Sequence, residues 1–162
     1  MDEIQRAAYD RMLDEYPRFQ TLNPVVQSGH GSGFAETYPP WERDNPQPGR
    51  WTVEMRKGDD PELFAGELLH GLGETDPHWQ RMRQNFAATL TPQQRAVDLR
   101  AWQGDGRPYD AWMQQTRLDA YLRALLFPRT APEWHGALTP EQRAMEPKFR
   151  DWLRSQSGDM RG

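Results

Sequence analysis

The sequence predicts an α+β fold, in which a small antiparallel or mixed sheet at about residues 24–56 packs on helices. Two observations support this prediction. Residues 51–55, WTVEM, alternate apolar and polar side chains with the period of two that is typical of a strand. After about residue 60 the apolar residues recur at helical spacing instead, which predicts an all-helical C-terminal half.

The N-terminal elements are predicted in order from the same patterns. Residues 3–20 form a helix, and Pro17 ends or kinks it. Its apolar stripe is Ile4, Ala8, Met12, Leu13 and Tyr16. Residues 24–40, PVVQSGHGSGFAETYPP, indicate one or two short strands around a Gly-rich turn, and the Pro-rich residues 41–49 indicate a loop.

The next predicted helix is ELFAGELLHGL, residues 62–72. We expect Asp59 or Asp60 to cap it, with Pro61 in its first turn. A glycine ends many helices because it adopts the left-handed conformation without strain. We therefore expect this helix to end near Gly71 or Gly73.

Two segments of the C-terminal half share one helix start. Residues 90–96, LTPQQRA, and residues 138–144, LTPEQRA, place Thr91 and Thr139 at N-caps. A proline follows each cap, and Gln94 and Gln142 can close a capping box. The segments are either an internal repeat or the same helix start used twice.

Two further helices are predicted in this half. TDPHWQRMRQNFAAT begins with an Asp-Pro signal. Residues 108–127 form a buried helix that ends at Phe127-Pro128. Its apolar face consists of Leu118, Tyr121, Leu122, Leu125 and Leu126.

Length and composition limit the class of protein. The 162 residues fit a single domain, with an α+β part over 1–80 and a helical part over 81–155. The absence of cysteine excludes disulfides and thiolate metal sites. A net charge of −4 lacks the basic surface that nucleic acid binding requires. No apolar run reaches the length of a membrane span, and the N-terminus does not have the pattern of a signal peptide.

One motif suggests chemistry: Glu67-x-x-His70-x-x-Gly73-x-x-Asp76. In zinc peptidases a second His precedes the Glu, two His bind the metal, and the Glu activates a bound water. Gly66 occupies that preceding position here. If the chain were a metallopeptidase, Glu67 would be the catalytic base and the ligands would come from His70, Asp76 and His78. His30 is a further candidate that could fold over the site.

The order of helix, short strands, a clear strand and the Glu-x-x-His helix over about residues 1–80 resembles the zincin-type metallopeptidases. That resemblance implies a backing helix, a small twisted sheet and an active-site helix packed under it. The motif lacks one ligand, so the resemblance implies the scaffold more than the activity.

A second resemblance covers about residues 34–150. ETYPPWERDNPQPGRWTVEM, ELLHGLGETDPHWQRMRQNF and DAWMQQTRLDAYLRALLFP are similar to uncharacterised proteins of tailed phages and prophages. It implies a phage protein in the virion or the host cytoplasm, with other phage structural proteins or copies of itself as partners. It implies no chemistry.

Three functions follow as hypotheses. The first is a non-catalytic virion or partner-binding accessory protein without a cofactor; the second is a zinc-dependent hydrolase; the third is an inhibitor of a host defence system. We expect Glu67 and His70 to share a helix face toward the sheet or a shallow cleft, without zinc. We expect Asp76 to cap the next helix, and a neighbouring group to satisfy His70.

Overall fold

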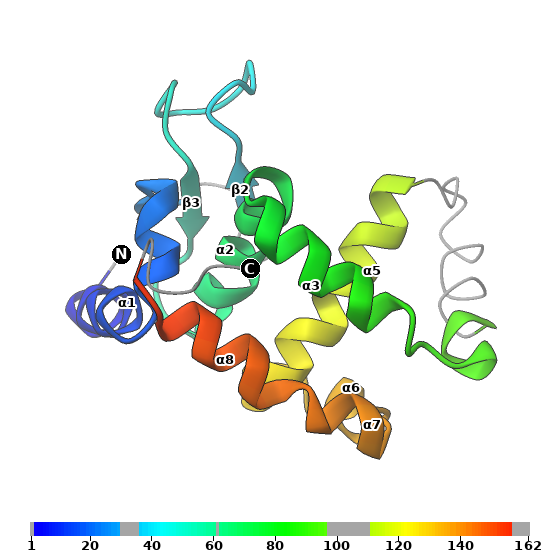
Figure 1. Ribbon diagram of the computed structural model, residues 1–162. Coiled ribbons are helices and arrows are strands. Elements are labelled where there is room, and N and C mark those ends of the chain that lie inside the picture. Colours follow the sequence, from blue (N-terminus) through cyan, green and yellow to red (C-terminus); the bar gives the residue numbers. More distant parts are fainter. Residues whose placement is uncertain (1, 30–35, 61, 97–110, 157–162) are drawn as a thin grey trace.

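The computed structural model describes residues 2–29, 36–60, 62–96 and 111–156. The predicted α+β class is confirmed, and within these ranges no strand follows residue 80 (Figure 1). The elements are helix α1 (Glu3–Glu15), 3-10 helix η1 (Pro17–Leu22), strands β1 (Val25–Ser28), β2 (Glu36–Tyr38) and β3 (Thr52–Met55), helices α2 (Leu63–Thr75), α3 (Pro77–Ala87) and α5 (Ala111–Leu126), 3-10 helix η2 (Pro128–Thr130), and helices α6 (Pro132–Gly136), α7 (Pro140–Ala144) and α8 (Glu146–Arg154).

The sheet is mixed and lies within residues 24–56, as predicted. Its strand order is β1-β3-β2, with β3 parallel to β1 and antiparallel to β2. Val53 of β3 is opposite Val26 on one side and Thr37 on the other. The candidate ligand His30 lies outside the described residues.

The loop between β2 and β3 is tied to the sheet by Asn45. The Asn45 amide donates to the carbonyls of Pro39 (2.8 Å) and Arg50 (2.7 Å). Its Oδ1 accepts from the hydroxyl of Thr52 (2.8 Å), which explains why Thr52 is buried although the alternation predicts an exposed residue. The loop, residues 39–50, is the projection at the top of Figure 1.

Helix α1 ends before Pro17 as predicted, but its buried face differs from the prediction. Ile4 is 76% exposed, and the buried residues are Gln5, Tyr9 and Met12. The Gln5 amide donates to two backbone carbonyls, those of Arg56 (2.8 Å) and Asp59 (3.0 Å). These bonds turn the Gln5 face inward, and Ile4 is left in solvent.

Helix α2 begins later than predicted. Its N-cap is Glu62, and no side chain caps it. Asp59 instead accepts from the backbone N–H of Arg56 (3.0 Å), and Asp60 accepts from that of Glu62 (2.9 Å). Both carboxylates therefore stabilise the turn before the helix, while Pro61 lies outside the described residues.

The predicted C-terminal end of α2 is also wrong, because the helix continues through Gly71 and Gly73 to Thr75. Both glycines are buried, and other side chains occupy the space that a Cβ would take. A Cβ on Gly71 would lie 2.7 Å from Leu22 Cδ1, and one on Gly73 would overlap the Arg83 guanidinium. These glycines allow close packing and do not end the helix.

The helix starts of the C-terminal half follow the sequence closely. Asp76 caps α3 by accepting from Trp79 N (3.0 Å). Thr91 Oγ1 accepts from Gln94 N (3.1 Å), and Thr139 Oγ1 accepts from Gln142 N (3.1 Å), so both predicted N-caps are confirmed. The predicted apolar face of α5 is buried throughout, and the helix ends at Leu126.

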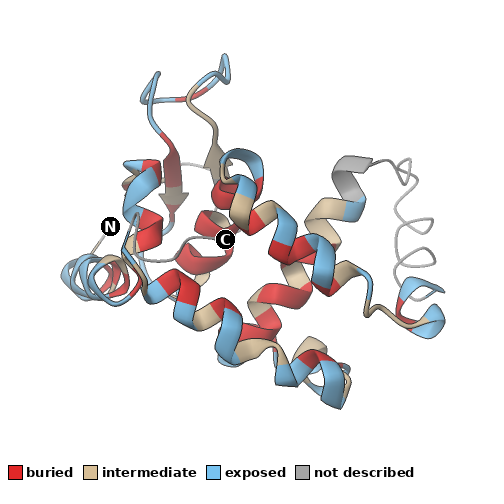
Figure 2. Ribbon diagram, viewed as in Figure 1, coloured by how far each residue is buried: buried red, intermediate tan, exposed pale blue. Residues whose placement is uncertain are grey.

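Large aromatic side chains supply much of the core. Trp79, Trp152, Phe19, Phe64, Phe86 and Phe149 are among the largest fully buried residues. Figure 2 shows buried positions on the facing sides of α3, α5 and α8. The same core cluster extends from Tyr9 of α1 to Leu153 of α8. Among the described residues, no helix is long and apolar enough to cross a membrane.

Candidate functional site

Glu67 and His70 lie one turn apart on α2, and each is held by a different neighbouring element. Thr37 of β2 donates its hydroxyl to Glu67 Oε2. His70 Nδ1 donates to Asp119 Oδ2 of α5 (2.8 Å). The two side chains therefore connect α2 to the sheet on one side and to the helical half on the other.

Asp119 is the centre of a buried polar network. Only 4% of its side chain is exposed, and Arg83 NH1 lies 3.2 Å from its Oδ1. The Arg83 NH2 group donates to the carbonyl of Gly73 (3.2 Å) and to Gln115 Oε1. A buried carboxylate requires such partners, because an unpaired charge in the interior costs several kcal/mol. The network fixes Asp119, and Asp119 in turn fixes the ring of His70.

The His70 imidazole is biased toward its protonated form. Burial alone would lower the pKa of His70. The hydrogen bond to Asp119 and the charges of Asp119 and Glu67 outweigh burial and raise the pKa above the ordinary 6.5. Nδ1 is bonded to Asp119, so the opposite ring nitrogen, Nε2, is on the edge of the ring turned away from Asp119. The exposed fraction of the His70 side chain is 34%.

These residues line a cleft of about 600 Å³ between α2, α5 and the 39–50 loop, which we call the acidic–aromatic cleft. One part of its lining is aromatic or apolar: Tyr38, Pro39, Trp41 and Trp51. The other part is titratable: Glu42, Glu67, His70, Glu74 and Asp119. Concave sites that combine aromatic walls with a few convergent polar groups are the usual form of binding sites.

Trp41 is the most exposed aromatic residue of this cleft. It is 66% exposed, whereas the neighbouring Trp51 is 5% exposed. The two rings meet edge to face, with centroids 5.5 Å apart and an interplanar angle of 79°. The buried Trp51 therefore supports a large aromatic surface that the protein leaves in solvent.

Gly66 has a structural reason in this fold. A Cβ at position 66 would lie 2.9 Å from Cδ of Arg123, which reaches across from α5. The space of the missing zinc ligand is thus occupied by an arginine side chain. A histidine at this position would have to displace Arg123 before it could reach toward His70.

The structure does not bring the other predicted ligands to His70. Asp76 Oδ1 caps α3, as expected. His78 stacks on Trp152 of α8, with ring centroids 5.3 Å apart and planes 7° apart. Over the ranges that the structure describes, no three His, Asp or Glu side chains are grouped so that they could hold a metal. The Arg123 side chain also fills the space beside Gly66, where the motif would place the preceding His. These residues therefore do not fit the zinc ligand set that the motif implies.

The main partners of the site, Asp119, Arg83 and Trp41, were not predicted from the sequence. Asp119 did carry a signal: it lies three residues before Leu122 and seven before Leu126, on the apolar face of its helix. A carboxylate on such a face must have a buried partner. The identity of that partner requires the tertiary structure, because His70 is 49 residues away in the chain.

Comparison of the chain with models of protein families, with curated proteins and with solved structures finds no match.

Proposed function

We propose that this chain is a non-catalytic, partner-binding protein, and that its acidic–aromatic cleft receives a cationic side chain of the partner. The observation that carries the proposal is the exposed Trp41 at the edge of a cleft with several carboxylates. The resemblance to tailed-phage and prophage proteins supports a virion structural or assembly role. The partner would then be another phage structural protein or a second copy of this chain.

The charges of the cleft favour a cation. Arg83 and His70 both contact Asp119 and offset its charge. The carboxylates of Glu42 and Glu74 also line the cleft, and among the described residues neither takes part in an ion pair. A cationic group entering the cleft would thus meet uncompensated negative charge.

The aromatic wall favours the same ligand. A guanidinium or ammonium group over a tryptophan face gains about 0.5–2 kcal/mol, depending on how far it is desolvated. Exposed tryptophans are also typical of the few residues that dominate the energy of a protein interface. Trp41 combines both properties, and the rigid Trp51 beneath it limits the entropy that binding would cost.

The test uses a capped Ala-Arg-Ala peptide and its citrulline analogue, which keeps the shape of arginine but not its charge. We expect the arginine peptide to shift the indole N–H resonance of Trp41 saturably, and the citrulline peptide to bind more weakly. Trp41→Ala and Glu42→Gln should weaken binding, whereas Glu3→Gln, an exposed change on α1, serves as the matched control. Equal binding of both peptides would refute the cationic ligand.

A hydrolase is the second candidate, and one specific observation favours it. Glu67 and His70 line the same cleft, and a buried carboxylate orients the imidazole as in many general acid–base catalysts. In this function Glu67 or His70 would transfer a proton during attack of water on the substrate. Peptide hydrolysis that is lost in Glu67→Gln but retained in Trp41→Ala would move this candidate to first place.

A further inference from the structure

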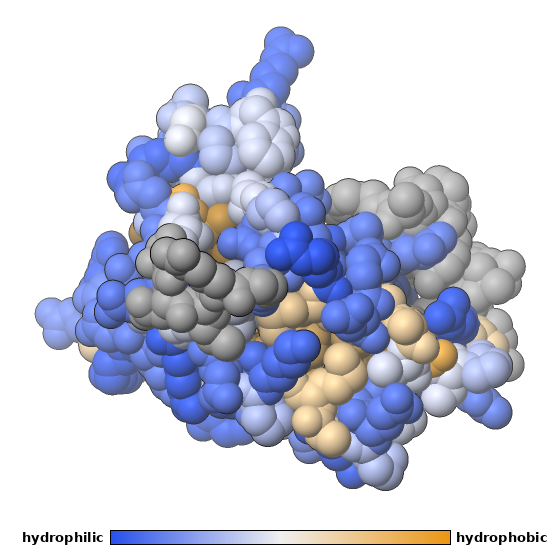
Figure 3. Space-filling view, in the orientation of Figure 1, coloured by the Kyte–Doolittle hydropathy of each residue, from blue (hydrophilic) through white to orange (hydrophobic). Residues whose placement is uncertain are grey.

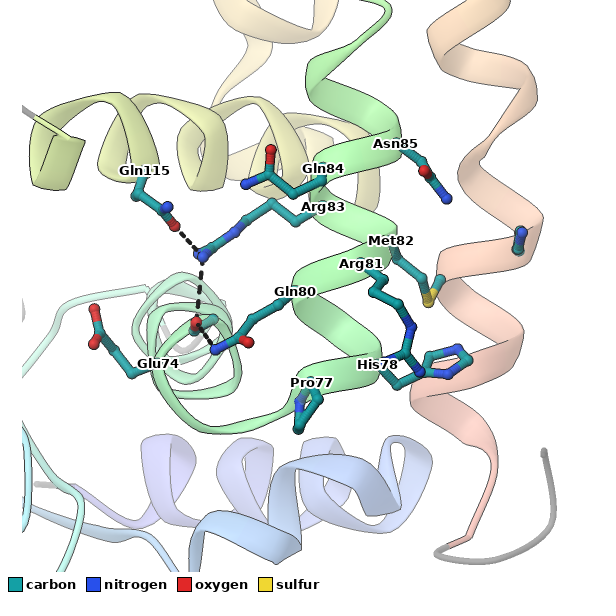
Figure 4. A pocket seen from close by; sticks show the side chains of 12 residues that line it. Glu74, Pro77, His78, Gln80, Arg81, Met82, Arg83, Gln84, Asn85 and Gln115 are labelled. Carbon is teal, nitrogen blue, oxygen red and sulfur yellow. Dashed lines mark hydrogen bonds between the residues drawn. The ribbon is translucent and has the colours of Figure 1, made fainter. Parts of the chain in front are cut away.

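A second concave surface lies around α3. The ligand that we infer for it is independent of the proposed function. It is a groove of about 1030 Å³ that wraps over the helix and reaches Lys148 of α8. In Figure 4 the side chains of His78, Arg81 and Asn85 project on one side of α3. Those of Gln80, Arg83 and Gln84 project on the other, toward Gln115.

The side of the groove that faces α8 is basic. Its lining includes His78, Arg81 and Lys148, which we call the basic end. Arg81 and Lys148 are exposed, and neither forms an ion pair with any residue that the structure describes. Among the described residues that line the groove, the only carboxylate is Glu74, which Figure 4 shows on the opposite side of α3 from His78.

The imidazole of His78 is held in a fixed orientation at this end. Its ring stacks on Trp152, and the Arg18 guanidinium lies over the same indole, with Cζ 4.7 Å from the ring centroid. Arg18 is 7% exposed, and its NH2 atom is buried with no hydrogen-bond partner in the part of the chain that the structure describes. A buried guanidinium nitrogen that finds no acceptor among the described residues adds positive potential on this side of α8.

The surroundings strengthen these charges. Figure 3 shows strongly hydrophilic side chains over α3 next to a hydrophobic surface between α3 and α8. Charges beside an apolar wall are less screened by water, so their field extends further into the groove.

We propose that the basic end of the α3 groove binds a phosphate-type oxyanion, held by Arg81 and Lys148 with the imidazole of His78 beside it. Arginine and lysine are the usual partners of phosphate, and arginine can donate two parallel hydrogen bonds to it. The carboxamide of Asn85 is a neutral donor further along the same side of α3. The oxyanion belongs either to a free ion or to a phosphorylated group of a partner, because both present the same oxygens.

The protonation of His78 supports this assignment and provides a readout. Burial lowers the pKa of His78, and the charges of Arg81, Arg18 and Lys148 lower it further, against the opposite effect of Asp76. A bound dianion would offset the cations and raise the pKa again. Anion binding and protonation of His78 are therefore coupled: for an anion of fixed charge, binding is tighter when the ring is protonated.

The experiment is an NMR titration of the full chain with sodium phosphate, with sodium chloride added to keep the ionic strength constant. We expect saturable shifts of the His78 ring and of α3 amides, together with an increase in the pKa of His78. Lys148→Gln and Arg81→Gln should each weaken binding about fivefold, which corresponds to one exposed charge pair. Lys57→Gln is the matched control, because Lys57 is exposed and is the only other lysine.

Two results would overturn the proposal. One is the absence of any saturable shift in the native chain. The other is an equal effect of Lys148→Gln and Lys57→Gln, with the remaining amide spectrum showing that both variants are folded. A parallel titration with a capped phosphoserine peptide separates the two sources: tighter binding than phosphate indicates a phosphorylated partner, and equal binding indicates a free ion. Both of these outcomes support the site.

Discussion

The side-chain amides of Gln94 and Gln142 donate a hydrogen bond to each other, with N–O distances of 2.9 and 2.8 Å. Each Oε1 also accepts from the backbone N–H of the threonine that caps its own helix. Each Nε2 also donates to a carbonyl at the other segment, that of Ala137 or Thr89. All four hydrogen-bonding positions of both amides are therefore used.

The relationship extends beyond the two glutamines. Arg95 donates to the carbonyl of Ala87 (3.2 Å), and Arg143 donates to that of His135 (3.4 Å). The two glutamines are 48 residues apart, and the same offset relates the two arginines and the two carbonyls. The two LTPxQRA segments are thus related by a local pseudo-twofold axis. Two independent helix starts would not by themselves produce this symmetry.

Replacing Gln94 by Leu should destabilise the protein, because it leaves the buried amide of Gln142 without its partner. We expect the free energy of unfolding to fall by about 1–3 kcal/mol. The double variant Gln94→Leu/Gln142→Leu should cost less than the sum of the two single changes, since it removes both halves of the pair. Strict additivity in urea unfolding would show that the two amides do not interact.

The caps can be tested separately from the glutamine pair. Thr91→Ala and Thr139→Ala each remove a hydroxyl that accepts a backbone N–H at a helix start. Each change should lower the free energy of unfolding by about 1 kcal/mol, whereas the Ser variants should be nearly neutral. Chemical denaturation of the four variants is the measurement, and Ala variants as stable as the native chain would contradict the capping.

Asp119→Asn should destabilise the protein and change His70 at the same time. Arg83 is 5% exposed and would lose its counter-charge, which costs about 3–5 kcal/mol for a buried pair. The pKa of His70 should fall, because Asp119 is the main group that raises it. NMR titration of the His70 ring measures this fall. Glu62→Gln, which breaks the exposed pair with Arg129, is the control that should leave both quantities almost unchanged.

The raised pKa of His70 has a defined consequence for stability. The folded state binds the His70 proton more tightly than the unfolded state, whose pKa is about 6.5. This contribution to stability is therefore complete below about pH 6.5 and is lost as the pH rises through the folded pKa. Urea midpoints across this range should show the loss in the native chain and not in His70→Gln. If the urea midpoint depended on pH equally in both proteins, the loss of stability would come from another titrating group.

Gly66→His tests whether the absent zinc ligand can simply be restored. The new side chain must displace Arg123, so we expect a loss of about 1–3 kcal/mol in the free energy of unfolding. Helix propensity would recover only about 0.3 kcal/mol of this loss, because histidine is itself a weak helix former. Gly136→Ala is the control, since no atom lies within 4 Å of a Cβ there. A gain in zinc affinity without loss of stability would show that the site can accept a metal ligand after all.

Local patterns predicted the features that depend on neighbours in the chain. The alternation of WTVEM located β3, and the threonine and Asp-Pro signals located three helix starts, because these features are decided within a few residues. The prediction for α1 was wrong at Ile4. The neighbouring Gln5 turns inward instead, because its side-chain amide donates to two carbonyls of a turn about fifty residues away. The apolar stripe alone contains no information about that turn.

The candidate site was predictable only in its local half. The spacing of Glu67 and His70 required a shared helix face, and both line the cleft. Their partners Thr37 and Asp119 come from a strand and a distant helix. The choice of a partner across the fold depends on how the elements pack, and a single sequence does not specify it.

The three buried glycines of α2, Gly66, Gly71 and Gly73, also bear on the order of folding. Each costs a helix about 0.5–1 kcal/mol relative to alanine, so the segment on its own would remain a coil in water. In the folded chain Leu22, Arg83 and Arg123 pack against these glycines from three other elements, so we expect the segment to become helical only when these contacts form. We therefore expect the spacing between Glu67 and His70 to form late in folding, so that partly folded chains would not present the cleft to a partner.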